Sequence, residues 1–304
     1  MTGDEYLKKE TQRTFILGDE WYYFKIYTGF KTADAILINA IFPLCNRLIE
    51  NEIIDKWFFI RYTDPKHHLR IRFHIKGINN IPAIIVNFNR IIKPYLESGL
   101  VWKIQADTYH RELERYGTST IEQIETLFFH DSEMICKIIS LEQIRKNENL
   151  RWLVSLRMID MLLNDFGLAL DNKCKLLNSM QEYFSIEFGA NSAFKRQLGQ
   201  KYRKEKANIN HILDFNSDSS DEFTLIHTII NSKSKRVSIF IQQIKEAIHK
   251  EENLSLEQLL QSIIHMMLNR LFISQNRHME LVIYDLLFRY YDSMIKRLKT
   301  TTSI

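Results

Sequence analysis

The stretch Trp57-Phe58-Phe59-Ile60-Arg61-Tyr62-Thr63-Asp64-Pro65-Lys66-His67-His68-Leu69-Arg70-Ile71-Arg72-Phe73 predicts two strands joined by a turn. Both ends of this stretch are rich in aromatic and β-branched residues, which favour extended chain. Asp64-Pro65, which lies between them, is a dipeptide typical of turns. The sequence therefore predicts a hairpin, and the elements on either side of it decide what kind of sheet it joins.

Outward from the hairpin, strands and helices alternate in the first third of the chain. The succession is strand, helix, strand, strand, helix, strand, which is the βαββαβ order of ferredoxin-like sheets, mixed or antiparallel. The predicted elements are Trp21–Tyr27, Ala33–Glu50, Trp57–Tyr62, Leu69–Ile75, Pro82–Leu96 and Leu100–Tyr109.

From Thr120 onward the apolar residues recur at helical spacing. Ser255 and Gln258 form the start signal of one of these helices. The polar stretch Asn208–Asp221 predicts a mobile loop. The predicted helices are Ile121–Ser140, Asn149–Leu168, Cys174–Phe188, Ser192–Ala207, Phe223–Lys250, Ser255–Ser274 and Arg277–Leu298. We expect an α+β protein with a sheet-containing subdomain over 1–118 and a helical subdomain over 119–304, the two sharing one active-site cleft.

Composition excludes several classes of protein. The chain has 304 residues, 45% of them hydrophobic, which is enough for a large core. A formal charge of +4 is too small to predict nucleic-acid binding. Cys45, Cys136 and Cys174 lack the paired spacing of metal or redox sites and suit a reducing cytoplasm. The first residues are polar, unlike a signal peptide, and no run of about 18 uncharged apolar residues predicts a membrane span.

The hairpin carries a pair of arginines that are candidates for binding an anion. Side chains of a strand alternate between its two faces, so Arg70 and Arg72 share one face and Leu69, Ile71 and Phe73 the other. Arginine is suited to a bidentate grip on a carboxylate. A solvent-facing strand with ordinary charges explains this segment equally well.

Glu112 and Arg115 form a second candidate group, where the last predicted strand ends. They are three residues apart, so they meet only if the chain turns or coils there, and Gly117 permits a turn. An exposed ion pair worth about 0–1 kcal/mol is the simpler interpretation of this pair alone.

His265 and Asn269 form the third group, within Ser262-Ile263-Ile264-His265-Met266-Met267-Leu268-Asn269-Arg270-Leu271-Phe272. Four residues apart, they lie on one face of a helix. Histidine is suited to proton transfer at neutral pH because the unperturbed pKa of imidazole is about 6.5. A lone histidine here would more often be a core or capping residue. Together, however, the arginines, the carboxylate and the imidazole suit proton removal beside a charged, amino-acid-like group.

The chain resembles the C-terminal elimination domain of class I lantibiotic dehydratases, which also occurs as a stand-alone thiopeptide-type bacteriocin biosynthesis protein. The matching stretches are Trp21–Tyr27, Trp57–Phe73, Glu112–Gly117 with Asp131-Ser132, and His265–Phe272, in the family's order. The chain departs from the family at Arg111, where Pro is frequent, at Thr118, where Gly is common, and over 208–221.

The resemblance implies a lyase reaction. In this family a separate domain or protein esterifies Ser or Thr of a precursor peptide with glutamate from glutamyl-tRNA, and the elimination domain expels the glutamate to leave dehydroalanine or dehydrobutyrine. The family's residues carry over as Arg70, Arg72, Glu112, Arg115 and His265. No cofactor and no metal is implied. The expected partners are a ribosomally made precursor peptide and a separate glutamylating enzyme, and relatives fused to the larger domain tend to dimerise.

Physical chemistry assigns roles to these residues. The glutamate is joined through its α-carboxyl, so its ammonium would meet Glu112 and its side-chain carboxylate Arg72 or Arg115. His265 would transfer a proton, either from Cα or to the departing glutamate. Arg61 and Asn269 complete the set of expected substrate-binding residues, although a structural role is favoured for Arg61 because it lies in an aromatic strand.

Two other functions remain open. Some relatives of the same fold form the pyridine ring of thiopeptides by a formal cycloaddition, and those typically lack the elimination set. The other is a non-catalytic scaffold that binds leader peptide for a glutamylating partner.

Overall fold

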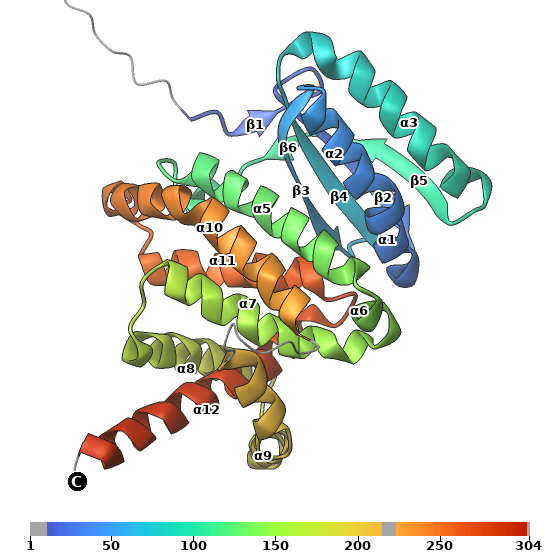
Figure 1. Ribbon diagram of the computed structural model, residues 1–304. Helices are drawn as coiled ribbons and strands as arrows, with labels where there is room; N and C mark the ends of the chain where they lie inside the picture. The colour runs from blue at the N-terminus through green and yellow to red at the C-terminus, as the bar shows by residue number, and fades with distance from the viewer. Residues whose placement is uncertain (1–10, 215–222, 303–304) are drawn as a thin grey trace, which may run out of the picture.

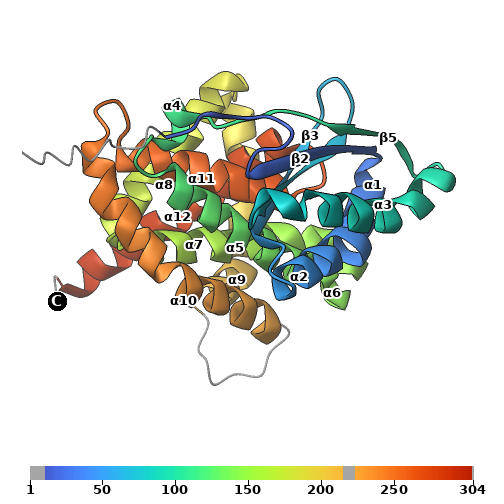
Figure 2. The same cartoon turned by 90° about the horizontal axis from the view of Figure 1, so that it is seen from above.

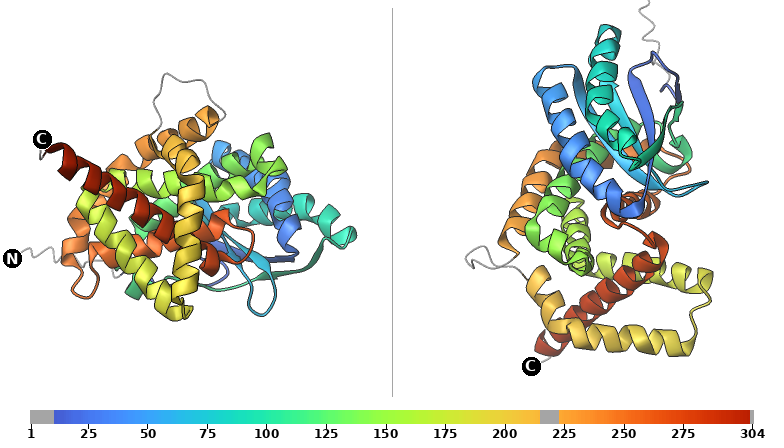
Figure 3. Two further views of the ribbon diagram at one scale, coloured as in Figure 1. Left: turned by 90° about the horizontal axis from the view of Figure 1, so that it is seen from below. Right: turned by 90° about the vertical axis from the view of Figure 1, so that its right-hand side faces the viewer.

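A four-stranded sheet at one end of the molecule leads into a larger bundle of helices (Figure 1). The computed structural model describes residues 11–214 and 223–302 of the chain. Figure 3 shows the helical part extending away from the sheet, with α9 and α12 at the far end. The predicted α+β organisation, with a sheet followed by a largely helical part, is confirmed.

The sheet is antiparallel throughout, in the order β3-β4-β2-β5. Its strands are β2 (Trp21–Thr28), β3 (Ile54–Tyr62), β4 (His68–Ile75) and β5 (Val101–Ala106). The predicted hairpin is β3-β4, and it places Arg72 between Phe58 of β3 and Tyr23 of β2. Leu69, Ile71 and Phe73 are fully buried on the other face, as their alternation predicts.

Helices α1 (Phe30–Ile36), α2 (Phe42–Glu50) and α3 (Ile81–Glu97) lie on the face of the sheet that carries Phe73 (Figures 1 and 2). On this face Phe24 of β2 stacks on Phe88 of α3, with ring centroids 4.1 Å apart. A π-helical turn, η1 (Leu37–Ile41), joins α1 to α2. Pro43 follows it, and because proline has no N–H to donate, the regular hydrogen-bond ladder is interrupted there.

The segment Phe30–Glu50 is the one described helical stretch with the length and apolar composition needed to cross a membrane. Helices that cover a sheet have the same composition. Here Ile36, Leu37 and Leu44 are fully buried within the core.

The prediction of one strand over Leu100–Tyr109 is wrong in its second half. The strand β5 ends at Ala106, and the chain turns at Asp107, whose carboxylate accepts from the Thr108 N–H at 2.8 Å and pairs with Lys25. After the turn β6 (Tyr109–His110) pairs with β1 (Thr14–Phe15) in a second, two-stranded sheet. This local capping, which strand propensity does not register, brings Tyr109 over the face that carries Arg72.

The predicted helices all occur; the helix over Ile121–Ser140 has the predicted ends, and the others begin or end at different residues. The loop predicted from Asn208 is wrong over its first residues, because α9 continues to Leu213; the rest of that prediction lies outside the described residues. Ser255 and Gln258 form the predicted capping box of α11. The helices after the sheet are α4 (Leu113–Tyr116), α5 (Ile121–Ser140), α6 (Glu142–Lys146), α7 (Arg151–Asp165), α8 (Leu170–Glu187), α9 (Ser192–Leu213), α10 (Thr224–Ala247), α11 (Leu256–Leu271) and α12 (Asn276–Thr302), with 3₁₀ turns η2 (Ile78–Asn80), η3 (Glu148–Leu150) and η4 (Ile248–Lys250).

Candidate functional site

A pocket of about 180 Å³ lies where the sheet meets α4 and α11. We call it the sheet-side pocket. It brings together all seven residues expected from the sequence, which come from β3, β4, the β6–α4 turn and α11. Its lining consists of Phe58, Ile60, Arg61, Tyr62, Arg70, Arg72, Tyr109, His110, Glu112, Arg115, Tyr116, Phe128, His265, Met266 and Asn269.

Arg72 is a buried cation without an ion-pair partner among the described residues. Only 7% of it is exposed, and its Nε makes no hydrogen bond. Its guanidinium lies 4.6 Å from the ring centres of both Tyr23 and Tyr109, and 5.1 Å from that of Phe58. Cation–π contacts offset part of the cost of burying this charge, but an anion in the pocket would offset more.

Arg70 lies two residues away on the same face and is held by other groups. Its guanidinium stacks on Tyr62 at 3.5 Å, and its Nε donates to His68 Nε2 at 3.1 Å. Separate aromatic contacts thus keep two like charges on one strand face without a carboxylate between them. Both arginines remain in the lining of the sheet-side pocket.

Glu112 and Arg115 meet as the sequence requires, because the chain coils into the single turn of α4. The Arg115 N–H donates to the Glu112 carbonyl at 2.9 Å, and their side chains form a half-exposed ion pair at 3.3 Å. Tyr116 follows, and burial, with Glu112 nearby, raises the pKa of its phenol to about 12. The Tyr116 hydroxyl is therefore neutral at physiological pH. Glu112 is the one carboxylate that lines the sheet-side pocket in the described part of the chain.

His265 is fixed by a carboxylate that the sequence reasoning missed. Its Nδ1 lies 2.9 Å and 3.0 Å from the two oxygens of Glu280, on α12. The buried Tyr284 donates to the same carboxylate at 3.0 Å. An imidazole whose Nδ1–H is bound to a carboxylate keeps its Nε2 as the free acceptor.

A second pocket, of about 290 Å³, lies on the other side of His265. We call it the helix-side pocket. His265 and Arg115 line both pockets, so they form the boundary between the two. The remaining lining comes from α8, α11 and α12 and consists of Ser179, Met180, Tyr183, Phe184, Gln261, Ser262, Arg277, Glu280 and Tyr284.

Arg61 and Asn269 line the sheet-side pocket, and most of their polar atoms are hydrogen-bonded within the protein, whereas Nη1 of Arg61 is buried without a hydrogen-bond partner. The side chains of Arg61 and Ile60 point to opposite faces of β3. The Arg61 guanidinium donates to the carboxylate of Asp34 at 2.5 Å and to the carbonyl of Arg270 at 3.0 Å. The Asn269 amide is hydrogen-bonded to the main chain of Arg61 in both directions at 2.9 Å. These contacts join the sheet to α11, and binding of substrate by Arg61 and Asn269 stays a prediction.

The C-terminal end of α11 is held by two arginines that share one carboxylate. Arg151 of α7 donates to the Leu271 carbonyl at 2.7 Å and pairs with Asp34, which also binds Arg61. Positive groups are favourable at a helix C-terminus. Burial raises the pKa of the Asp34 carboxyl, but the two guanidinium groups outweigh burial and hold this pKa below its ordinary value.

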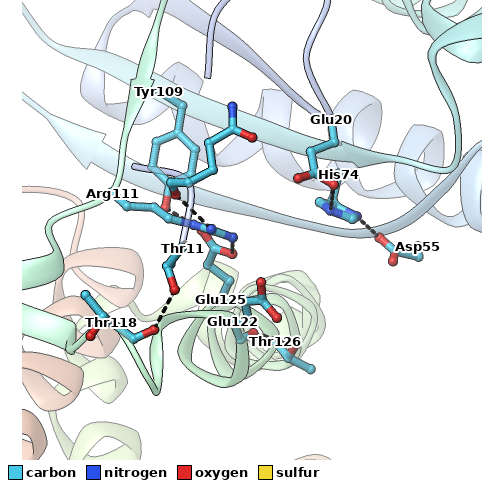
Figure 4. A network of polar contacts seen from close by, with 11 residues as sticks. Thr11, Glu20, Asp55, His74, Tyr109, Arg111, Thr118, Glu122, Glu125 and Thr126 are labelled. Carbon is cyan, nitrogen blue, oxygen red and sulfur yellow. Dashed lines mark hydrogen bonds and ion pairs between the residues drawn. The ribbon is translucent and has the colours of Figure 1, made fainter. Parts of the chain in front are cut away.

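Arg111, where the chain departs from the family, is paired with a carboxylate from α5. Its Nε and Nη2 bind the two oxygens of Glu125 at 2.8 Å and 2.7 Å, and the Tyr109 hydroxyl donates to Glu125 at 2.8 Å (Figure 4). Glu125 is fully buried. This network fixes β6, and with it the Tyr109 ring that contacts Arg72.

Glu280, Asp34 and Arg151 bind residues of the expected site or its supporting helix, and the sequence analysis did not predict them. A weak signal existed for Glu280, because it lies between Met279 and Leu281 and four residues before Tyr284, so a carboxylate interrupts an apolar helix face. No group of three or more potential metal ligands occurs in residues 11–214 and 223–302.

Comparisons with known proteins give a consistent picture. The sequence profile of a family described as the lantibiotic biosynthesis dehydratase C-terminal region matches residues 21–291. The nisin biosynthesis protein NisB of Lactococcus lactis subsp. lactis is 26% identical over 280 residues, which are 90% of this chain and 26% of NisB. The subtilin biosynthesis protein SpaB of Bacillus subtilis is 25% identical over 257 residues, 84% of this chain and 24% of SpaB. The chain thus spans about a quarter of the length of these relatives.

Two solved structures share the fold. The tRNA-dependent lantibiotic dehydratase MibB from Microbispora sp. 107891 superposes with a TM-score of 0.73 at 21% identity, over 93% of this chain and 29% of MibB. The pyridine synthase TbtD from thiomuracin biosynthesis superposes with a TM-score of 0.64 at 11% identity, over 90% of this chain and 98% of TbtD.

Proposed function

Because the chain belongs to the family of lantibiotic biosynthesis dehydratase C-terminal domains, we propose that it is a lyase that eliminates glutamate from glutamylated Ser and Thr residues of a ribosomally made precursor peptide. The observation that carries this proposal is that one pocket holds both Arg72, a buried cation without a counter-ion in the described parts of the chain, and an imidazole oriented by Glu280.

Arg72 would bind the side-chain carboxylate of the departing glutamate. A buried guanidinium without a counter-ion is preorganised to bind an anion, because it has already lost its hydration when the protein folds and needs no further desolvation on binding. Arg115 would stand at the boundary of the two pockets, near the ester, and Arg70 would add to the positive potential. Glu112, which is more than half exposed, would receive the ammonium group of glutamate.

His265 would remove the Cα proton through Nε2, since Glu280 occupies Nδ1. The C–H electron pair then forms the Cα=Cβ double bond. The Cβ–O bond breaks, and glutamate leaves with the electron pair of that bond as its α-carboxylate. The imidazolium releases its proton to solvent. Dehydroalanine remains from Ser and dehydrobutyrine from Thr, and no oxidant or cofactor is consumed.

The chain would act in the cytoplasm as the stand-alone half of a split dehydratase. A separate glutamyl-tRNA-dependent enzyme would supply the glutamylated peptide. The chain would form a homodimer, as relatives fused to the larger domain tend to do. Pyridine formation is the second candidate, because the pyridine synthase TbtD shares the fold over 90% of this chain and 98% of TbtD. The Glu112, Arg115 and His265 set supports elimination over it.

The test is to mix the purified protein with a peptide carrying a chemically glutamylated Ser. Elimination predicts free glutamate together with a dehydroalanine peptide. A pyridine synthase would leave that ester intact and act instead on a peptide already containing dehydroalanines. A non-catalytic scaffold would bind peptide and release no glutamate.

A further inference from the structure

The helix-side pocket has polar groups that the protein itself leaves unused. Ser179 and Tyr183 lie four residues apart on α8, and Gln261 and Ser262 lie one turn before His265 on α11. These four side chains line the pocket and make no side-chain hydrogen bond within the described parts of the chain. Each can both donate and accept, which is the capacity needed to bind peptide N–H and C=O groups.

The two pockets differ in charge. The sheet-side pocket holds Arg70, Arg72 and Arg115 against the single carboxylate of Glu112. In the helix-side pocket each charged group has a partner. Arg115 pairs with Glu112, and Arg277 pairs with Glu187, which lies outside the lining, while stacking on Phe184 at 4.3 Å. Glu280 binds His265. An anionic amino acid is therefore favoured on the sheet side and a neutral chain on the helix side.

The boundary between the pockets coincides with the groups that would perform the reaction. His265 and Arg115 belong to both linings, so a substrate atom beside them has one pocket on each side. The glutamyl ester also has two halves that meet at the bond to be broken, a small charged acyl group and a neutral peptide.

We propose that the helix-side pocket is the subsite for the peptide main chain next to the modified residue, with Ser179, Tyr183, Gln261 and Ser262 as its hydrogen-bonding groups. This inference rests on the proposed function, because it assumes a glutamylated peptide as substrate. It assigns selectivity for substrate length to α8, an element that contributes nothing to the sheet-side pocket.

The experiment compares two unreactive probes by direct binding. In both, the ester oxygen is replaced by an amide nitrogen, so that 2,3-diaminopropionate carries the glutamyl group and no elimination occurs. One probe is the single acylated residue with acetyl and methylamide ends, and the other is a peptide extended on both sides. The variants are Ser179→Trp, which fills the pocket from an exposed position, and Tyr183→Ala. Ser238→Trp, at an exposed position of α10 outside both pockets, is the matched control.

Each variant of the subsite should weaken the extended probe by about tenfold, or about 1.4 kcal/mol, and leave the capped residue within about twofold. Ser238→Trp should change neither. Equal weakening of both probes, no weakening of either, or failure of both to bind the unaltered protein would overturn the subsite. The outcome is separable from the proposed function, because binding is read without turnover, and the absence of glutamate release from a true ester would overturn only the reaction.

Discussion

The side-chain amide of Asn269 accepts a hydrogen bond from the Arg61 N–H and donates one to the Arg61 carbonyl, both at 2.9 Å. Since β3 is an edge strand, these main-chain groups have no neighbouring strand to pair with. Two residues earlier, the Phe59 N–H donates to Ser132 of α5 at 3.2 Å, and Arg270 donates to the Phe59 carbonyl at 2.8 Å. Side chains of the helical part thus complete the edge of the sheet and fix α11, which carries His265.

Asn269→Ala should therefore destabilise the protein. Two buried main-chain groups would lose their partners, at a cost of about 2–3 kcal/mol in the free energy of unfolding. Asn269→Asp should be no milder, because a carboxylate can accept from the Arg61 N–H but cannot donate to its carbonyl. Urea unfolding measures both variants. An unchanged unfolding midpoint with a raised KM would instead make Asn269 a substrate-binding residue.

Arg72→Met should separate activity from stability. It removes a buried cation that has no counter-ion within residues 11–214 and 223–302, so the free energy of unfolding should be unchanged or rise by about 1 kcal/mol. Glutamate release from glutamylated peptide should fall by about 10²-fold or more, because the charge that binds the leaving group is lost.

Arg111→Met is the matched control, since Arg72 and Arg111 are buried to the same degree, at 7% and 5% exposure. Here the change leaves the buried Glu125 carboxylate without a cation, with only the Tyr109 hydroxyl still donating to it, and should cost about 3–5 kcal/mol. Thermal and urea unfolding compare the two variants. A loss of stability in Arg72→Met as large as that in Arg111→Met would show that Arg72 is a structural cation.

Glu280→Gln tests the orientation of the imidazole. The amide keeps the size of the side chain but can present N–H to Nδ1, which favours the wrong tautomer, so kcat should fall by about 10–100-fold with little change in KM. Tyr284→Phe removes only the hydroxyl bound to Glu280 and should have a smaller effect in the same direction. A raised KM with normal kcat in Glu280→Gln would assign Glu280 to substrate binding.

We expect the ion pairs of the Asp34 carboxylate to add to the free energy of unfolding in a way that depends on acid pH. Its pKa in the folded protein lies below the ordinary value of 3.8. The stabilisation is therefore complete above pH 3.8 and is lost as the pH falls through the folded-state pKa. Asp34→Asn should destabilise at neutral pH, and its difference from the unaltered protein should shrink under more acidic conditions. Urea unfolding at a series of pH values measures this difference, and a pH-independent difference would contradict the assignment.

Local pattern predicted the elements and the face of β4 that carries the arginines. Period-two alternation correctly predicted that Arg72 and Ile71 lie on opposite faces of β4. The spacing of Glu112 and Arg115 correctly predicted that the chain must coil for their side chains to meet. Combined with the pairing of the hairpin, the same alternation could have shown that Arg61 pairs with Leu69 and therefore points to the face of the sheet away from Arg72. The turn at Asp107 was missed because a side-chain cap, not a break in hydrophobicity, ends β5.

The partners of the site residues could not be predicted, because they come from elements that meet only in the folded chain. Helical spacing placed Asn269 on the face of His265, but not against the edge of β3. Glu280 is fifteen residues from His265, and Asp34 is far in sequence from the two arginines it joins. Such contacts depend on how helices pack, which periodicity does not specify.

The most direct measurement of the central claim is glutamate release by His265→Ala from a chemically glutamylated Ser peptide, beside the unaltered protein. The account predicts free glutamate and dehydroalanine with the unaltered protein, and intact glutamylated peptide with the variant. Dehydration by His265→Ala at the unaltered rate would contradict it.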